Sequence, residues 1–209
     1  FKINKNIFYK NPFKILNHKK IDILFECIGQ SDGISKKIVE KALKNKIHVI
    51  TPNKALISNH GDYLSKIAEN KKVNLEFEAS VGGGIPIIKS FKVGYSANQI
   101  ESVYGILNGT TNFILTKVFE NRSEFSDVLE EAQRLGFAEA DPTADVSGLD
   151  AAYKIVILTA VALKADIQID DVFYEGIESV ALKDTLYLDE LGFRVRLIAK
   201  AKRVGDGLN

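Results

Sequence analysis

The 209-residue sequence is poor in several residue types that would indicate particular chemistries. It has one cysteine, Cys27, which excludes an internal disulfide framework and a zinc site built from several thiolates. Its three histidines, His18, His48 and His60, lie far apart in the chain. It has no methionine and begins with phenylalanine, so we expect it to be a fragment of a longer product. The cysteine usage fits a reducing compartment, and we expect a cytoplasmic protein.

An excess of one charge and a long apolar run are also missing. The 28 basic and 27 acidic residues nearly cancel, to +1, so no electrostatic footprint for nucleic acid or anionic lipid is present. The longest apolar run, residues 155–163, is interrupted by Thr159 and is too short to span a bilayer. The amino-terminal segment lacks a signal-peptide apolar stretch. We therefore expect no nucleic-acid or membrane partner and favour a small-molecule ligand.

What the sequence does contain is a globular composition with alternating strand and helix patterns. Hydrophobic residues make up 45% and charged residues 26%. The run at residues 21–29 is typical of a parallel strand covered on both faces. An alternation of strands and helices predicts a partial Rossmann-type, doubly wound α/β sheet. The expected strands are residues 21–29, 47–51 and 73–80, and the expected helices are residues 34–45 and 60–71.

The pattern changes near residue 80, where we place a domain boundary. Residues 1–80 are expected to be the carboxy-terminal part of a nucleotide-binding domain, and residues 81–209 an α+β substrate domain. In the second part the apolar spacing predicts two strands and several helices. The expected strands are residues 100–109 and 193–201, and the expected helices are residues 85–92, 110–121, 125–136, 149–164 and 184–192.

Asp150 and Lys154 are the only charged residues in the apolar segment 149–163. A spacing of four puts both side chains on one face of a helix, about one turn apart. Such a pair is commonly a structural ion pair near a helix start. The apolar surroundings favour a polar site instead, because burial disfavours the charged form of a lysine and helps it to exchange protons.

The loop at residues 137–148 adds three carboxylates, Glu139, Asp141 and Asp145. This acidic cluster would suit the amino group of a substrate. A solvated loop or a nonspecific cation site explains the composition equally well, and the spacing does not decide between them.

Three further features of the sequence are weaker indications of a site. The glycines of SVGGGIPI, residues 80–87, let a backbone approach a ligand, but no GxGxxG or GxxxxGK[ST] motif occurs in the chain. Lys54 follows a strand at the edge where open α/β sheets bind ligands, although an exposed lysine at a helix start is the plainer interpretation. We expect Cys27 to be a small buried residue.

Several segments occur in the order found in one enzyme family, and they cover residues 21–203. Taken together, the chain resembles homoserine dehydrogenase, which interconverts homoserine and aspartate semialdehyde with a nicotinamide cofactor. The segments are FECIG, HVITPNKALIS, FEASVGGGIPII, GILNGTTNFIL and EAQRLGFAEADPTADVSGLDAAYK.

The resemblance implies roles for residues of the substrate site. Lys154 matches the catalytic lysine, which exchanges a proton with the semialdehyde or hydroxyl oxygen, and Asp150 matches the partner that binds substrate and orients this lysine. Glu139 matches the residue that holds the substrate's amino group, and Asp145 is a second acid nearby. The positions that line the substrate and nicotinamide region are Gly109, Thr110 and Gly136.

The resemblance also implies cofactor and cation sites. Lys54 matches a lysine beside both cofactor and substrate, with a share in proton transfer, and Ile28 and Gly29 fall where the nicotinamide half passes the sheet. A monovalent cation, usually sodium, is expected at a loop that binds mostly through backbone oxygens. The matching residues are Glu78, Val81, Gly83 and Ile85.

The family's first strand and glycine-rich phosphate loop have no counterpart in the sequence. The preference for NAD or NADP is therefore unreadable, and we expect the 209-residue polypeptide alone to fold poorly. The resemblance implies a homodimer. Two alternatives stay open, another Rossmann-type enzyme such as aspartate-semialdehyde dehydrogenase and a noncatalytic module that binds an amino acid or a cation.

Overall fold

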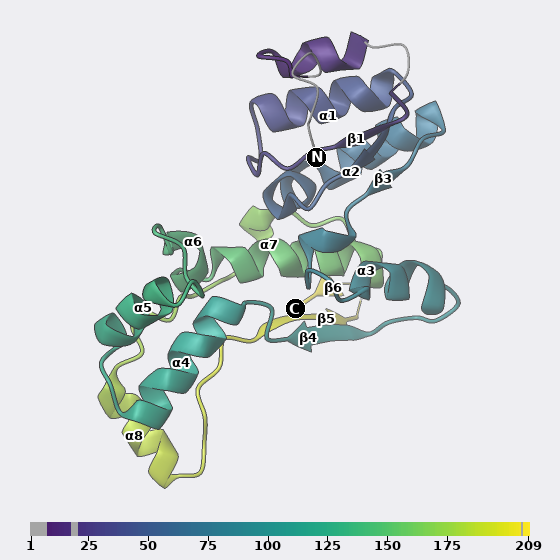
Figure 1. Cartoon of the computed structure of the whole chain (residues 1–209). Helices are drawn as coiled ribbons and strands as arrows, with labels where there is room; N and C mark the ends of the chain where they lie inside the picture. The colour runs from purple at the N-terminus through teal and green to yellow at the C-terminus, as the bar shows by residue number, and fades with distance from the viewer. Residues whose placement is uncertain (1–7, 18–20, 206) are drawn as a thin grey trace. The chain divides into compact units, whose positions relative to one another are not determined.

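The computed structural model describes all residues except 1–7, 18–20 and 206 (Figure 1). His18 therefore lies outside the described residues. The chain divides into two compact units, residues 1–90 and 91–209. Among the described residues, no helix is both long enough and apolar enough to cross a membrane.

The first unit is a three-stranded parallel sheet in the order β1-β2-β3, with helical crossovers between its strands. This confirms the expected α/β class and the Rossmann-type connectivity. The strands are β1 (Ile23–Phe25), β2 (His48–Ile50) and β3 (Leu75–Glu76), and the helices are η2 (Pro12–Asn17), α1 (Ile34–Lys44), α2 (Lys54–Lys71) and η3 (Glu78–Ser80). A short α3 (Ile87–Lys89) ends the unit and continues into the π-helical turn η4 (Ser90–Gly94).

One face of this sheet forms the core of the unit. Leu24 pairs with Val49, and Val49 pairs with Leu75, so the three side chains form one row across the strands. All three are buried. Because α1 and α2 contact each other and the sheet, they cover this face. Burying one continuous apolar row fixes the register of the three strands.

The other face of β1 differs from the sequence expectation. Ile23 is 48% exposed and Phe25 67% exposed, and Cys27, which continues the same alternation, is exposed rather than buried. The predictions of a strand covered on both faces and of a buried cysteine were therefore wrong. Side chains alternate along a strand, so residues two apart share the face that the two helices leave uncovered.

Helix α2 begins at Lys54, six residues earlier than the expected start at residue 60. The side chain of Asn53 caps the helix by accepting the backbone N–H of Leu56 at 3.1 Å. An asparagine at this position satisfies one of the free N–H groups of the first turn. Pro52 directly precedes this cap residue.

The second unit is built around an antiparallel sheet in the order β4-β5-β6. Helix α7 packs on β5, and the buried residues between them include Ala151, Ile155 and Ala201. The carboxy-terminal strand starts at residue 199 instead of 193, and β6 was not predicted. The elements are β4 (Ser102–Gly105), β5 (Ala199–Val204), β6 (Gly207–Leu208), α7 (Leu149–Leu158), the π-helical turn η5 (Thr159–Leu163) and η6 (Ile169–Asp171).

A second cluster in this unit consists of α4 (Gly109–Asn121), α5 (Phe125–Arg134), α6 (Thr143–Val146) and α8 (Leu182–Glu190) (Figure 1). Ile114, Leu115 and Val128 lie at its buried centre. Helix α5 ends just before Gly136, which has a φ of 79°, the left-handed conformation that glycine commonly adopts after a helix. The cluster holds α4 beside the loop that leads into α7.

Candidate active site

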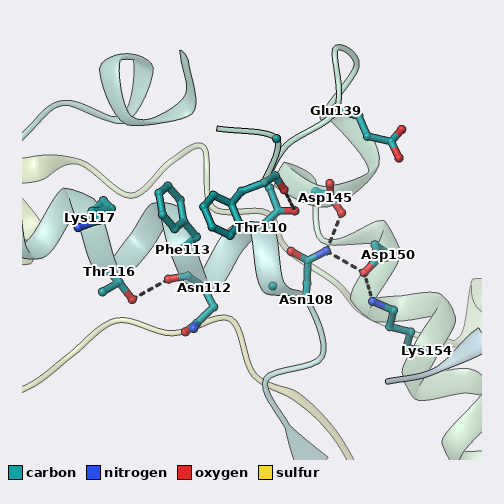
Figure 2. A pocket seen from close by; sticks show the side chains of 13 residues that line it. Asn108, Thr110, Asn112, Phe113, Thr116, Lys117, Glu139, Asp145, Asp150 and Lys154 are labelled. Carbon is teal, nitrogen blue, oxygen red and sulfur yellow. Dashed lines mark hydrogen bonds and ion pairs between the residues drawn. The ribbon is translucent and has the colours of Figure 1, made fainter. Parts of the chain in front are cut away.

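The candidate active site is a cavity of about 660 Å³ in the second unit (Figure 2). Its wall comes from the amino-terminal half of α4, the loop after α5 and the first turns of α7. Seven of the residues singled out from the sequence line this one cavity. They are Gly109, Thr110, Gly136, Glu139, Asp145, Asp150 and Lys154.

Asp150 and Lys154 form an ion pair on one face of α7, as their spacing predicted. Lys154 Nζ lies 2.7 Å from Asp150 Oδ2 and donates a second hydrogen bond, 2.8 Å long, to the carbonyl oxygen of Leu107. The Asp150 side chain is 3% exposed and that of Lys154 17% exposed. The carboxylate is thus buried in the wall, while the ammonium reaches the cavity. An ammonium has three N–H bonds, so these two contacts leave one N–H bond that can donate to a ligand.

Asn108 links this pair to the acidic loop, as Figure 2 shows. Its side-chain nitrogen Nδ2 donates to Asp145 Oδ1 at 2.6 Å and to Asp150 Oδ2 at 2.7 Å. Its oxygen Oδ1 accepts the backbone N–H of Thr111 at 2.7 Å. A backbone N–H can only donate, so this bond fixes which end of the amide faces the carboxylates. Two carboxylates are therefore held close together by a neutral donor between them.

The local sequence explains why these side chains converge. Asn108 is the N-cap of α4, where asparagine is favoured, and the capping bond orients its amide. Two glycines then allow the segment before α7 to pack closely. A Cβ on Gly148 would lie 2.7 Å from the Glu175 carbonyl oxygen, and one on Gly176 would lie 2.3 Å from that of Val146. This packing positions the first turn of α7, which carries Asp150.

The acidic loop contributes its residues unequally. Glu139 lines the cavity and is exposed, and Figure 2 shows its carboxylate directed away from the Asn108 amide. Gln133 holds this part of the loop by donating to the carbonyl oxygens of Glu139 and Ala140. The Asp141 carboxylate accepts the hydroxyl and the backbone N–H of Thr143, and these bonds lower the pKa of Asp141. Asp141 therefore stabilises the start of α6 through these two hydrogen bonds.

Six residues of the cavity lining were not predicted from the sequence: Asn108, Asn112, Phe113, Thr116, Lys117 and Phe137. Phe113 and Phe137 stack with their ring centroids 4.5 Å apart, and the Thr110 hydroxyl donates to the Phe137 carbonyl oxygen at 2.8 Å. The cavity extends along α4 past Thr116 and Lys117. Asn108, Phe113 and Phe137 lie inside motifs that the sequence highlighted, but only the folded chain shows that their side chains meet.

Three of the residues expected to hold the cofactor, Ile28, Gly29 and Lys54, lie in the first unit, whereas Gly136 lies in the second. Ile28 and Gly29 follow β1 at its carboxyl end, and Gly29 has a φ of 89° with open space where a Cβ would be. Lys54 is the first residue of α2, after the carboxyl end of β2. Glu26, which was not considered as a site residue, is 2% exposed and accepts the backbone N–H of Ile28 at 2.7 Å.

The expected cation loop, residues 78–85, lies beside the short helix α3. Glu78 does not present a free carboxylate, because its two oxygens accept the backbone N–H groups of Ile88 and Lys89 at 2.8 Å each. Gly82 and Gly83, with φ of 76° and 58°, curl the loop. Val81 is buried and Ile85 is 65% exposed. In the parts of the chain that the structure describes, no cluster of three or more histidine, cysteine or carboxylate side chains suits a metal.

Comparison with known proteins covers nearly the whole chain. The family model described as homoserine dehydrogenase matches residues 86–208, and the one described as its NAD binding domain matches residues 3–78. The chain is 43% identical to a homoserine dehydrogenase of Neisseria gonorrhoeae over 201 aligned residues. The alignment covers 96% of this chain and 46% of that protein. It is 45% identical over 195 residues to the one of Pseudomonas aeruginosa, covering 93% of the chain and 45% of that protein.

Two solved structures show the same similarity in three dimensions. A homoserine dehydrogenase from Thiobacillus denitrificans has a TM-score of 0.91 at 44% identity, covering 95% of this chain and 46% of that one. A hyperthermophilic archaeal homoserine dehydrogenase in complex with NADPH has a TM-score of 0.80 at 29% identity, covering 94% and 57%. The chain spans about half the length of the curated relatives it matches.

Proposed function

The chain belongs to the homoserine dehydrogenase family, and on this premise we propose that it forms part of an NAD(P)-dependent oxidoreductase that interconverts L-homoserine and L-aspartate 4-semialdehyde. This reaction serves the synthesis of threonine, methionine and isoleucine from aspartate. The observation that carries the proposal is the buried Asp150–Lys154 pair, which is joined through Asn108 to Asp145 at the wall of one cavity.

The proposed substrate site separates the two ends of the amino acid. Lys154 meets the oxygen that is reduced or oxidised, and the acids of the preceding loop attract the positively charged amino group. Asp145 and Glu139 line the same cavity as Lys154, which supports this arrangement. Gly109 and Thr110, at the start of α4, and Gly136 line the remainder of the substrate region.

The proton chemistry rests on Lys154. When bound, the nicotinamide cofactor supplies a hydride to the carbonyl carbon of the semialdehyde, or accepts one from homoserine in the reverse direction. Lys154 gives a proton to the carbonyl oxygen as negative charge develops there, and in reverse it accepts the hydroxyl proton. Asp150 and the Leu107 carbonyl oxygen hold its ammonium in place. Lys54 shares in this proton transfer.

The first unit is the proposed cofactor side of the enzyme. We assign residues 1–80 to the nucleotide-binding domain and residues 81–209 to the catalytic domain. Ligands of open α/β sheets bind outside the carboxyl ends of the strands, where Ile28, Gly29 and Lys54 lie. The open space at Gly29 and the apolar Ile28 fit a flat nicotinamide ring. NAD and NADP are both retained as candidates.

A sodium ion in the loop at residues 78–85 is a further part of the proposal. With the Glu78 carboxylate engaged by α3, the ligands would be backbone carbonyl oxygens of Glu78, Val81, Gly83 and Ile85. The positive φ angles of Gly82 and Gly83 support such a set, because they let the backbone curve closely around a ligand. A homodimer and a cytoplasmic location also stay predictions.

Steady-state kinetics of the full-length protein that contains this chain test the proposed function. We expect L-homoserine to drive the reduction of NAD or NADP, D-homoserine to serve as the inactive control, and replacement of sodium by choline to lower the rate. Binding of L-homoserine without turnover would favour the noncatalytic alternative. Oxidation of L-aspartate 4-semialdehyde that requires phosphate and is lost on alkylation of Cys27 would favour aspartate-semialdehyde dehydrogenase chemistry.

A further inference from the structure

Glu26 is a buried carboxylate at the carboxyl end of β1 that the proposed chemistry does not use. It is 2% exposed, and its two oxygens accept five hydrogen bonds. The donors to Oε1 are the backbone N–H groups of Ile28 (2.7 Å) and Gly29 (3.4 Å) and the hydroxyl of Ser35 (3.0 Å), and the donors to Oε2 are the hydroxyl of Thr51 (2.7 Å) and the amide of Asn53 (3.3 Å).

These five donors are neutral groups, and they offset the cost of burying the carboxylate. An ionised group in an apolar setting is costly unless hydrogen bonds replace its water. Burial raises the pKa of the Glu26 carboxyl, but the bonds from Thr51, Ile28, Ser35 and Asn53 outweigh it and leave the pKa below its usual value. The carboxylate is therefore ionised in the folded protein near neutral pH.

The donors come from the two loops at the ligand-binding edge of the sheet. Ile28 and Gly29 leave β1, while Thr51 and Asn53 leave β2 and lead into α2. Asn53 adds two bonds of its own, one to the carbonyl oxygen of Gln30 at 2.8 Å and one from the backbone N–H of Leu56. The same side chain that contacts Glu26 therefore joins the first loop to the start of α2.

We propose that Glu26 is a positioning residue for the nicotinamide cofactor, which fixes the loop at residues 27–30 and the start of α2 in one arrangement before the cofactor binds. The inference rests on the proposed function, because it takes this edge as the cofactor side. A preordered loop lowers the conformational entropy that binding must offset. Loss of the carboxylate therefore weakens cofactor binding, although Glu26 itself is too buried to contact the cofactor.

Glutamine cannot replace Glu26 in this network. If the glutamine oxygen takes the place of Oε1, its NH2 group faces the Thr51 hydroxyl and the Asn53 amide. The Asn53 amide nitrogen is already directed toward glutamate as a donor, since its oxygen accepts Leu56 N–H. Two donors would then face each other, which leaves buried N–H groups without an acceptor. Glu26→Gln keeps the shape of the side chain and replaces one of its two acceptor oxygens by a donor.

The test measures cofactor affinity directly by NADPH or NADH fluorescence titration of the full-length protein, together with kcat and KM. We expect Glu26→Gln to raise the Kd of the cofactor by about tenfold or more, with a smaller change in the KM for L-homoserine at saturating cofactor. Thr51→Val should move the Kd in the same direction, and Thr51→Ser, which restores the hydroxyl, should return it to within about twofold of wild type. Glu69→Gln, a charge removal on the exposed face of α2, is the matched control.

Amide hydrogen exchange of the cofactor-free protein gives an independent reading. Faster exchange of residues 27–30 and 51–56 in Glu26→Gln, with unchanged exchange in the second unit, is the expected pattern. A Glu26→Gln protein that binds the cofactor as wild type does would overturn the inference, even where its melting temperature has fallen. Failure of the proposed function would give a different result: the wild-type protein would bind the cofactor but would not oxidise L-homoserine.

Discussion

The ammonium of Lys154 lies 2.7 Å from a carboxylate oxygen of Asp150, one helical turn earlier on α7. The two side chains differ in exposure, 17% for Lys154 against 3% for Asp150. An ordinary surface ion pair would leave both ends in water and contribute little to stability. Here the carboxylate also accepts a bond from Asn108, and the ammonium also donates to Leu107. The arrangement favours a lysine that is held for chemistry rather than a helix-stabilising pair.

Asn108→Asp separates the two roles of Asn108. Aspartate can still accept the Thr111 N–H and cap α4, but it has no N–H to donate to Asp145 and Asp150. We expect kcat/KM for L-homoserine to fall by about tenfold or more, because three carboxylates would then crowd one corner of the cavity. Steady-state kinetics well below the melting temperature check this. Wild-type kcat/KM in Asn108→Asp would mean that the amide does not organise the site.

Gly176→Ala tests the packing that places α7. The added Cβ would lie 2.3 Å from the Val146 carbonyl oxygen and 2.8 Å from Ser147 Cα, so the backbone must shift. We expect a loss of about 1 to 3 kcal/mol in the free energy of unfolding, measured by chemical denaturation. Gly94→Ala, where nothing lies within 4 Å of the added Cβ, is the control and should change stability by less than about 0.5 kcal/mol. Equal stability of the two variants would contradict the predicted clash.

Glu26 predicts a dependence of stability on pH. Because its pKa is lower in the folded protein, it stabilises the fold above the unfolded pKa of about 4.3, and this contribution is lost as the pH falls through the folded value. Its hydrogen-bond donors are hydroxyls, an amide and backbone N–H groups, none of which titrates in this range. The gap in melting temperature between wild type and Glu26→Gln should be constant near neutral pH and narrow below about pH 4. A gap that stays the same down to acid pH would contradict the assignment.

The sequence predicted helices and strands best in long segments where apolar residues recur at regular spacing. Helices α1, α4 and α5 lie within a few residues of the expected ranges, and so do β1, β2 and α7 when its π-helical continuation η5 is included. The start of α2 was missed because Asn53 was not recognised as a cap. Exposure of Cys27 was missed because a run of apolar letters shows how strongly a strand is hydrophobic, but not which of its faces a helix covers.

For the candidate site, spacing alone predicted that Asp150 and Lys154 share one face of a helix, and the structure confirms it. The bridging amide of Asn108 was not predicted, because it lies 37 residues from Asp145 and 42 from Asp150. Contacts of this separation depend on how α4 and α7 pack. Glu26 was missed for the same reason, since its partners include Thr51, 25 residues away.

The most direct test of the central claim is the turnover of Lys154→Ala in the full-length protein, compared with Lys164→Ala. Lys164 is an exposed lysine at the end of the same helical segment and serves as the matched control. We expect Lys154→Ala to lower kcat with L-homoserine by about a hundredfold or more. This variant should bind NADPH or NADH within about threefold of wild type, and Lys164→Ala should stay close to wild type in both kcat and cofactor affinity. A kcat for Lys154→Ala within about twofold of wild type would contradict the proton-transfer role of this lysine and the site built around it.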